Sequence, residues 1–109
     1  GNKIYDKGLS FGENSIGEIF NIDFQNAKLG IAVKDGSKLK LSNYKLVNNE
    51  YDLAVFNKKK EYDSSLLNIS NPIEDNKLKF LIGFKNNIIK DNIYLNEKID
   101  NKKINELFY

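Results

Sequence analysis

The side chains of this chain that are able to do acid–base chemistry are carboxylates, and one of them has distinctive surroundings. Asp52 lies near the start of an apolar run, Tyr51-Asp52-Leu53-Ala54-Val55-Phe56, and has no neighbour that would obviously use it. A carboxylate held in apolar surroundings is a candidate catalytic group. The commoner role is structural, with the carboxylate hydrogen-bonded to nearby backbone at the start of a strand, and we expect that role for Asp52.

Two other pairs of acidic residues would suit acid–base catalysis only if they were buried. Glu74 and Asp75 flank a turn, and Glu13 and Glu18 are five residues apart. Most carboxylates are exposed to solvent, so we interpret both pairs as surface residues. The lysine run at 58–60 is likewise expected to form a solvated loop rather than an anion site, because adjacent like charges repel when they are held in a sheet.

The residue types that are missing exclude several kinds of chemistry. The sequence has no His and no Cys, which removes the usual nucleophile pairs and the nitrogen and sulfur ligands of zinc. All 17 basic residues are Lys, and the fork of donors with which Arg binds phosphate or guanine is absent. We therefore expect no catalytic residue, no metal and no cofactor. We also do not expect sequence-specific recognition of nucleic acid.

Length and composition indicate one β domain spanning residues 1–109. A chain of 109 residues that is 40% hydrophobic is long enough to bury one core. The absence of Met, including an initiator, suggests a mature or excised segment. No apolar run approaches the roughly 18 residues that span a bilayer. The absence of Cys leaves the compartment open, and we slightly favour a periplasmic or secreted location over the cytoplasm.

Alternating apolar residues predict a series of short strands. The strongest turn signal is Asp35-Gly36, which predicts a hairpin in which Leu29, Ile31 and Val33 share a buried face with Leu39 and Leu41. The apolar run 51–56 is expected to be a central strand, buried on both faces. The other predicted strands are 2–5, 16–24, 66–69, 77–84, 88–89 and 93–95, with 44–47 extending the second arm of the hairpin.

The remaining segments complete the expected architecture. Gly8, Gly12 and Gly17 match no phosphate-binding pattern and are interpreted as turn and bulge positions. The tail at 96–109 allows a short helix capped by Asn96. No internal repeat is apparent. The pattern predicts an all-β fold, a small antiparallel barrel or sandwich of seven to nine short strands, with a C-terminal helix as an option.

The order of the motifs between residues 27 and 84 resembles the first barrel of trypsin-like serine proteases, particularly the HtrA-type bacterial proteins. Those motifs are Ile31-Ala32-Val33-Lys34-Asp35-Gly36, the run 51–56, Leu66-Leu67-Asn68-Ile69-Ser70 and Leu81-Ile82-Gly83-Phe84. The resemblance places Asp52 where the family has the acid that orients the catalytic histidine. This chain has no histidine and no Gly-x-Ser-x-Gly after Phe84, so the resemblance implies a degenerate half-barrel without hydrolytic activity.

Three functional hypotheses follow from these observations. The first is a noncatalytic interaction domain of a bacterial exported protein, which presents an edge strand or an aromatic patch to a protein partner or to another domain of its own chain. Its aromatic candidates are Tyr5, Tyr44, Tyr51, Tyr62, Tyr94 and Tyr109. The second is a fragment of a protease-like enzyme whose missing half supplies catalysis. The third is an OB-like binder of oligonucleotides or oligosaccharides.

Overall fold

The computed structural model describes residues 5–95, and this part of the chain consists of nine β-strands joined by turns, with no helix. The strands are β1 (Tyr5–Phe11), β2 (Ile16–Gln25), β3 (Ala27–Lys34), β4 (Lys38–Val47), β5 (Tyr51–Phe56), β6 (Leu66–Pro72), β7 (Phe80–Ile82), β8 (Asn87–Lys90) and β9 (Ile93–Leu95). The expectation of an all-β protein is therefore confirmed. The expected strand at 2–5 and the tail helix fall wholly or mostly on residues 1–4 and 96–109, outside the described residues.

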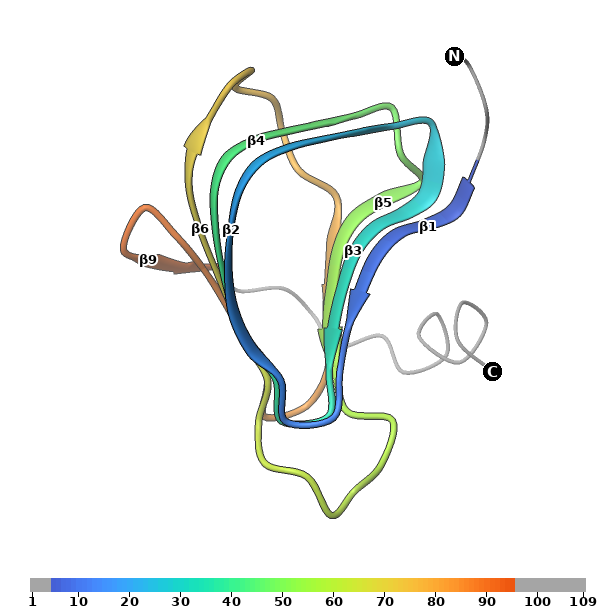
Figure 1. Ribbon diagram of the computed structural model, residues 1–109, viewed down its shortest axis with the longest axis vertical. Coiled ribbons are helices and arrows are strands. Elements are labelled where there is room, and N and C mark those ends of the chain that lie inside the picture. The colour runs from blue at the N-terminus through green and yellow to red at the C-terminus, as the bar shows by residue number, and fades with distance from the viewer. Residues whose placement is uncertain (1–4, 96–109) are drawn as a thin grey trace.

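The strands form two parallel sheets, and the expected antiparallel barrel or sandwich is wrong. Sheet A has the order β1-β3-β5-β7, and sheet B has the order β2-β4-β6-β8-β9. All pairs are parallel except β8 with β9. Successive strands alternate between the sheets, so the chain winds as a β-solenoid of about four turns, whose strands overlie one another in Figure 1.

The ladders reveal a repeat that the sequence analysis missed. Tyr5 pairs with Ala27 and Leu29 pairs with Tyr51, each 22 residues further along the chain. We call the successive turns coil 1 (5–26), coil 2 (27–48), coil 3 (49–75) and coil 4 (76–95). Coil 3 is longer because its loop after β5 adds six residues, so that Lys38 pairs with Leu66, 28 residues on. This insertion hides the repeat from a scan for a fixed period.

Asp35 and Gly36 form a corner of the solenoid rather than the tip of a hairpin. Their φ angles are 53° and 77°, the positive values that a two-residue hairpin turn also needs. However, β3 and β4 belong to different sheets and are not paired with each other. The prediction that Leu29, Ile31, Val33, Leu39 and Leu41 share one buried face is correct for four of these five residues. Ile31, Val33, Leu39 and Leu41 lie in one core cluster, whereas Leu29 belongs to a second cluster.

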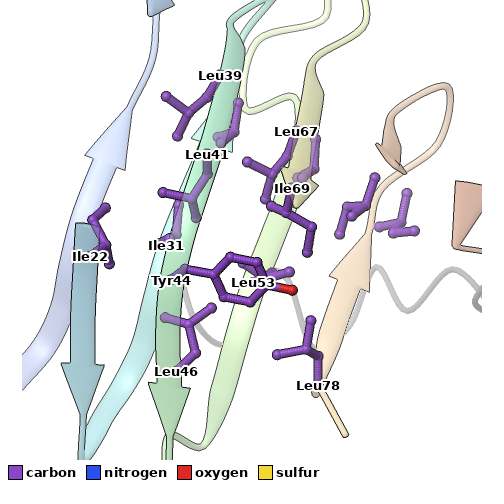
Figure 2. Packing of buried hydrophobic residues seen from close by; sticks show 14 residues of the cluster. Ile22, Ile31, Leu39, Leu41, Tyr44, Leu46, Leu53, Leu67, Ile69 and Leu78 are labelled. Atoms are coloured by element: carbon purple, nitrogen blue, oxygen red, sulfur yellow. The ribbon is translucent and has the colours of Figure 1, made fainter. Parts of the chain in front are cut away.

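The main core is a stack of inward-facing side chains between the two sheets. Leu39 pairs with Leu67 and Leu41 with Ile69 across neighbouring coils, and all four are at most 2% exposed. Figure 2 shows these side chains in columns beside Leu53 and the ring of Tyr44. Full burial of each such side chain contributes about 1.5–3 kcal/mol, so these columns are the main source of stability.

The second cluster lies on the opposite face of sheet A. Successive side chains of a strand point to opposite faces, so Ala54 faces away from its neighbours Leu53 and Val55 in the main core. The cluster is Leu29, Ala32, Ala54, Phe56 and Leu81, all at most 6% exposed. The strand β5 lies between β3 and β7 and contributes to both clusters. Its predicted character, a central strand buried on both faces, is confirmed.

Asparagines make the sharp corners of the coils. Asn21, Asn43 and Asn71 have φ angles of 65°, 58° and 54° and recur once per coil in coils 1 to 3, whereas Asn92 of coil 4, with a φ angle of 67°, lies in the turn between β8 and β9. Asn and Gly tolerate this left-handed conformation better than other residues do. At another corner Asn48 donates through Nδ2 to Oδ1 of Asn26, with the two atoms 2.6 Å apart. The abundance of Asn therefore has a structural use here, although an AT-rich genome alone would also favour it.

A column of small polar residues stabilises the corner between the sheets. The hydroxyl of Ser37 accepts the backbone N–H of Ser15 at 3.1 Å, and the hydroxyl of Ser65 accepts the N–H of Gly36 at 2.9 Å. Below them, Oδ1 of Asn86 accepts the N–H of Ser65 at 2.6 Å. Because backbone groups at a corner leave the sheet ladders, these side chains supply the missing hydrogen bonds.

The last coil is shorter than predicted and ends in a hairpin. The expected strand 77–84 is reduced to β7. At Gly83 the backbone lies close to β5, since an added Cβ would lie 3.2 Å from Cα of Phe56. The strands β8 and β9 correspond to the predicted strands 88–89 and 93–95, and they pair across Asp91 and Asn92. The strand β9 is therefore the edge strand of sheet B at this end, and it is only three residues long.

Candidate functional site

Asp52 is a buried structural residue in this fold. Asp52 is 3% exposed. Its Oδ1 accepts a hydrogen bond from Nδ2 of Asn49 at 3.0 Å, and its Oδ2 accepts one from the backbone N–H of Lys79 at 2.8 Å. Both oxygens thus hold neighbouring segments together. These contacts correspond to the structural role expected from the sequence, extended to a segment 27 residues away.

Asn49 is the partner of Asp52 that sequence reasoning missed. Its Oδ1 accepts the N–H of Ala27 at 2.8 Å, and its Nδ2 also donates to the carbonyl oxygen of Phe24 at 3.2 Å. Asn49 is 3% exposed, so these bonds satisfy a side chain that would be costly to bury alone. Only the 22-residue repeat, which aligns Asn49 with Ala27, would have drawn attention to it.

The other candidate carboxylates lie on the surface, as expected. Glu74 and Asp75 form separate ion pairs with Lys45 and Lys90, with nitrogen–oxygen distances of 3.6 and 3.7 Å. Glu18 lies 4.0 Å from the ammonium of Lys40. Glu13 lies 3.3 Å from the ammonium of Lys59, and this hydrogen bond raises the pKa of Lys59. Neither predicted pair converges on a common site, and no group of acidic residues between 5 and 95 has the geometry of a metal site.

The loop after β5 is exposed but anchored through its backbone. Lys58, Lys59 and Lys60 are exposed, in agreement with the prediction of a solvated loop. The backbone N–H groups of Lys58 and Lys59 donate to Oδ1 of Asp35 at 2.7 and 2.9 Å. Asp35 is 2% exposed, so it fastens the inserted loop to coil 2. The backbone of the loop is therefore held in place at its first two lysines.

Four tyrosines have described side chains, and their exposure differs widely. Tyr44 is 1% exposed, Tyr51 and Tyr62 are half-buried, and Tyr94 is 58% exposed. The hydroxyl of Tyr44 is buried without a hydrogen-bond partner among the described residues. Its burial, with the negative charges of Asp91 and Asp75, raises the pKa of Tyr44 to about 12. Of these four tyrosines, Tyr94 alone is largely exposed.

Gly8 and Gly17 make room for two phenylalanine rings rather than forming turns. Both glycines lie within strands. A Cβ added at Gly8 would lie 2.7 Å from Cγ of Phe24, and one added at Gly17 would lie 2.7 Å from Cζ of Phe11. The two rings occupy the space that larger side chains would fill. They form part of the surface at the first end of the solenoid.

That end of the solenoid is open in the described part of the chain. The strands β1 and β2 are each paired on one edge only. Interior positions of coil 1 are incompletely covered: Ile19 and Phe24 are half-buried, whereas Leu41 and Leu46, one coil further on, are 0% exposed. A further layer of strand would complete their burial. We call the free edge of β2, with these half-buried residues, the coil 1 edge.

The coil 1 edge lacks two of the features that commonly block strand addition. It is ten residues long and contains neither Lys nor Pro, two of the residues with which proteins commonly block edges. Its outward side chains include Ile16 and Phe20, which are 82% and 56% exposed. The corner at Asn21 bends it but leaves five residues on one side and four on the other. This edge is therefore the candidate binding site.

Comparison with known proteins returned no match to a protein family, a curated protein or a solved structure. The comparisons consequently do not bear on the resemblance to trypsin-like proteases. The antiparallel half-barrel that the resemblance implied is nevertheless not the observed fold. Among residues 5–95, no helix has the length and apolar character that crossing a membrane requires.

Proposed function

We propose that this chain is a noncatalytic interaction domain that binds an extended segment of a partner protein at the coil 1 edge. The observation that carries the proposal is the difference in burial between coils, because Ile19 is half-buried where Leu41 in the next coil is 0% exposed. An added strand would pair with free backbone groups of β2 and cover these apolar side chains, which is the physical basis of β-augmentation.

A noncatalytic role is supported by the residues that this chain offers for chemistry. Both oxygens of Asp52 accept hydrogen bonds, and the other candidate carboxylates are on the surface. We expect no peptidase activity from the purified chain. Turnover of casein that persisted after repurification and vanished in Asp52→Asn would contradict this part of the proposal.

The proposal places the domain in a bacterial exported protein, as the cysteine-free composition permits. Detection of the protein in the periplasmic or extracellular fraction of its source cells would support that location, and its confinement to the cytoplasm would exclude it. The OB-like alternative required an antiparallel barrel, which the solenoid replaces.

Site-specific photocrosslinking in the source cells tests the binding edge. A photoreactive phenylalanine analogue is placed at Phe20, which is exposed on coil 1, or at Phe84, which is 67% exposed on coil 4. Because the two positions are similarly exposed, the control accounts for nonspecific reaction. We expect a discrete crosslinked protein from Phe20 only. Equal crosslinking at both positions, or none at Phe20, would count against the coil 1 edge.

A purified crosslinking partner then allows a direct test by hydrogen exchange. Binding at the coil 1 edge should slow exchange of the amides of β2 and leave those of β9 unchanged, because β9 lies at the other end of sheet B. Protection confined to β9 or to the loop after β5 would place the binding site elsewhere.

A further inference from the structure

The coils of this solenoid alternate in charge. Coil 1 has four acidic residues and one lysine, a net charge of −3, and coil 2 has five lysines and one acid, a net charge of +4. Coil 3 has six acids and three lysines, a net charge of −3, and coil 4 has four lysines and one acid, a net charge of +3. Because parallel strands stack residues directly upon one another, the alternation brings opposite charges together between neighbouring coils.

The register shows how the alternation works at individual residues. Glu18 pairs with Lys40, and Asp23 pairs with Lys45. Lys45 also forms an ion pair with Glu74 of coil 3, with the charged atoms 3.6 Å apart. A lysine of coil 2 is thus bordered by acidic residues on both sides. Coil 2 thus shows that outward lysines and inward apolar side chains fit next to an acidic coil of this protein.

At the coil 1 edge the acidic residues have a lysine coil on one side only. Glu18 and Asp23 are exposed and point outward, and the half-buried Ile19 and Phe24 alternate with them on the inward face. A second copy of this edge would bring a coil of −3 against another of −3, which disfavours symmetric pairing. The complementary occupant therefore has positive charge outward and apolar side chains inward.

We propose that the coil 1 edge selects a lysine-rich extended segment of a partner protein, which pairs in parallel with β2. Lysines of the segment lie opposite Glu18 and Asp23, and its apolar residues cover Ile19 and Phe24. This inference rests on the proposed function, and it adds the chemistry of the partner. In the stack of coils, the segment lies against the free side of coil 1 in the same way that coil 2 lies against coil 3.

Strand β4 itself supplies the probe for this proposal. The peptide KLKLSNYKLV, the sequence of β4, has the required pattern, and in the fold one of its edges already pairs with the acidic coil 3. Two matched peptides replace its three lysines by glutamine or by glutamate. Binding of each capped peptide to the full chain is followed by NMR, with the amides of β2 as the reporter.

We expect the lysine peptide to bind most tightly. Each opposite-charge pair across strands strengthens binding by about 1.5- to 5-fold, so the glutamine peptide should bind several-fold more weakly. The glutamate peptide should bind more weakly still. In the protein, Glu18→Gln and Asp23→Asn should each reduce the preference for lysine over glutamine by a similar factor. Glu61→Gln, an exposed change on the loop after β5, should leave the preference unchanged.

The outcomes separate this inference from the proposed function. Equal shifts of the β2 amides by all three peptides would overturn the preference for lysine and leave strand addition at this edge intact. A preference for lysine that Glu18→Gln and Asp23→Asn do not reduce would overturn the assigned pairing. Failure of every peptide to perturb the β2 amides would count against both proposals.

Discussion

Asn49 and Asp52 are joined by a buried hydrogen bond of 3.0 Å, and their two side chains together bind backbone groups of the three other coils. Asn49 binds Phe24 of coil 1 and Ala27 of coil 2, and Asp52 binds Lys79 of coil 4. A pair of polar residues in coil 3 therefore connects the whole stack at one corner. This arrangement accounts for the burial of both residues at 3% exposure.

We predict that Asp52→Asn destabilises the protein by about 1–3 kcal/mol, although the change preserves the shape of the side chain. The side chain of asparagine has one oxygen, which accepts hydrogen bonds, and one NH₂ group, which only donates them. The NH₂ group would therefore face another donor, either Nδ2 of Asn49 or the N–H of Lys79. Urea unfolding measures the loss. Asp63→Asn, an exposed change, should alter the free energy of unfolding by less than about 0.5 kcal/mol. Similar stabilities for the two variants would refute the structural role of Asp52.

The column of serines yields a second prediction. Ser65→Ala should destabilise the protein by about 1–3 kcal/mol, because the N–H of Gly36 and Oδ1 of Asn57 each lose a partner. The adjacent Ser64 is exposed, so Ser64→Ala is a matched control with an expected effect within about 0.5 kcal/mol. Thermal unfolding of both variants gives the comparison. A larger effect at Ser64 than at Ser65 would be inconsistent with the described corner.

Stability should fall at alkaline pH through Tyr44. Its pKa is about 12 in the folded protein against about 10 in the unfolded chain, because burial penalises the phenolate. The resulting stabilisation, at most about 3 kcal/mol, is complete below pH 10 and is lost as the pH rises through about 12. The difference in free energy of unfolding between the native chain and Tyr44→Phe, followed across this range, isolates the effect from the lysines. A difference that is constant with pH would contradict it.

The outward face of sheet A should not tolerate charge at Ala54. This residue points away from the main core, yet it is 0% exposed. Ala54→Lys should therefore cost about 3 kcal/mol or more through overpacking and burial of an ammonium group. Ser10 pairs with Ala32, which in turn pairs with Ala54, so Ser10 and Ala54 lie in one column across the sheet. Unlike Ala54, Ser10 is exposed. Ser10→Lys should be nearly neutral, and equal effects at the two positions would argue against the second cluster.

Local pattern was sufficient to place most strands but not to pair them. Alternation correctly located β2 and β6, because side chains alternate between faces whatever the pairing. The continuous apolar run at 51–56 located β5, and the predicted strands 88–89 and 93–95 correspond to β8 and β9. The turn at Asp35-Gly36 misled the interpretation, since the same positive φ angles serve both a hairpin and a solenoid corner. The partner of β3 is therefore not β4, its neighbour in sequence, but β1 and β5.

The candidate site was only partly visible in the sequence. An edge strand or an aromatic patch was expected to be the binding element, and the pairs Glu13/Glu18 and Glu74/Asp75 were expected to be on the surface. Which edge remains free depends on the order of strands in each sheet, and that order joins residues 22 or more apart. The role of Asn49 depends on the same stacking.

The sequence by itself determined that the chain is all-β, that 51–56 is buried on both faces, and that no imidazole or thiol is available for catalysis. These properties depend on residue types and on neighbours along the chain. Only the tertiary structure decided that the strands run parallel, that Asp52 and Asn49 meet, and that β2, with its acidic residues, is an edge strand among residues 5–95. The reason is physical: each coil obtains its hydrogen bonds and its apolar cover from the coils before and after it, so pairing is a property of the stack.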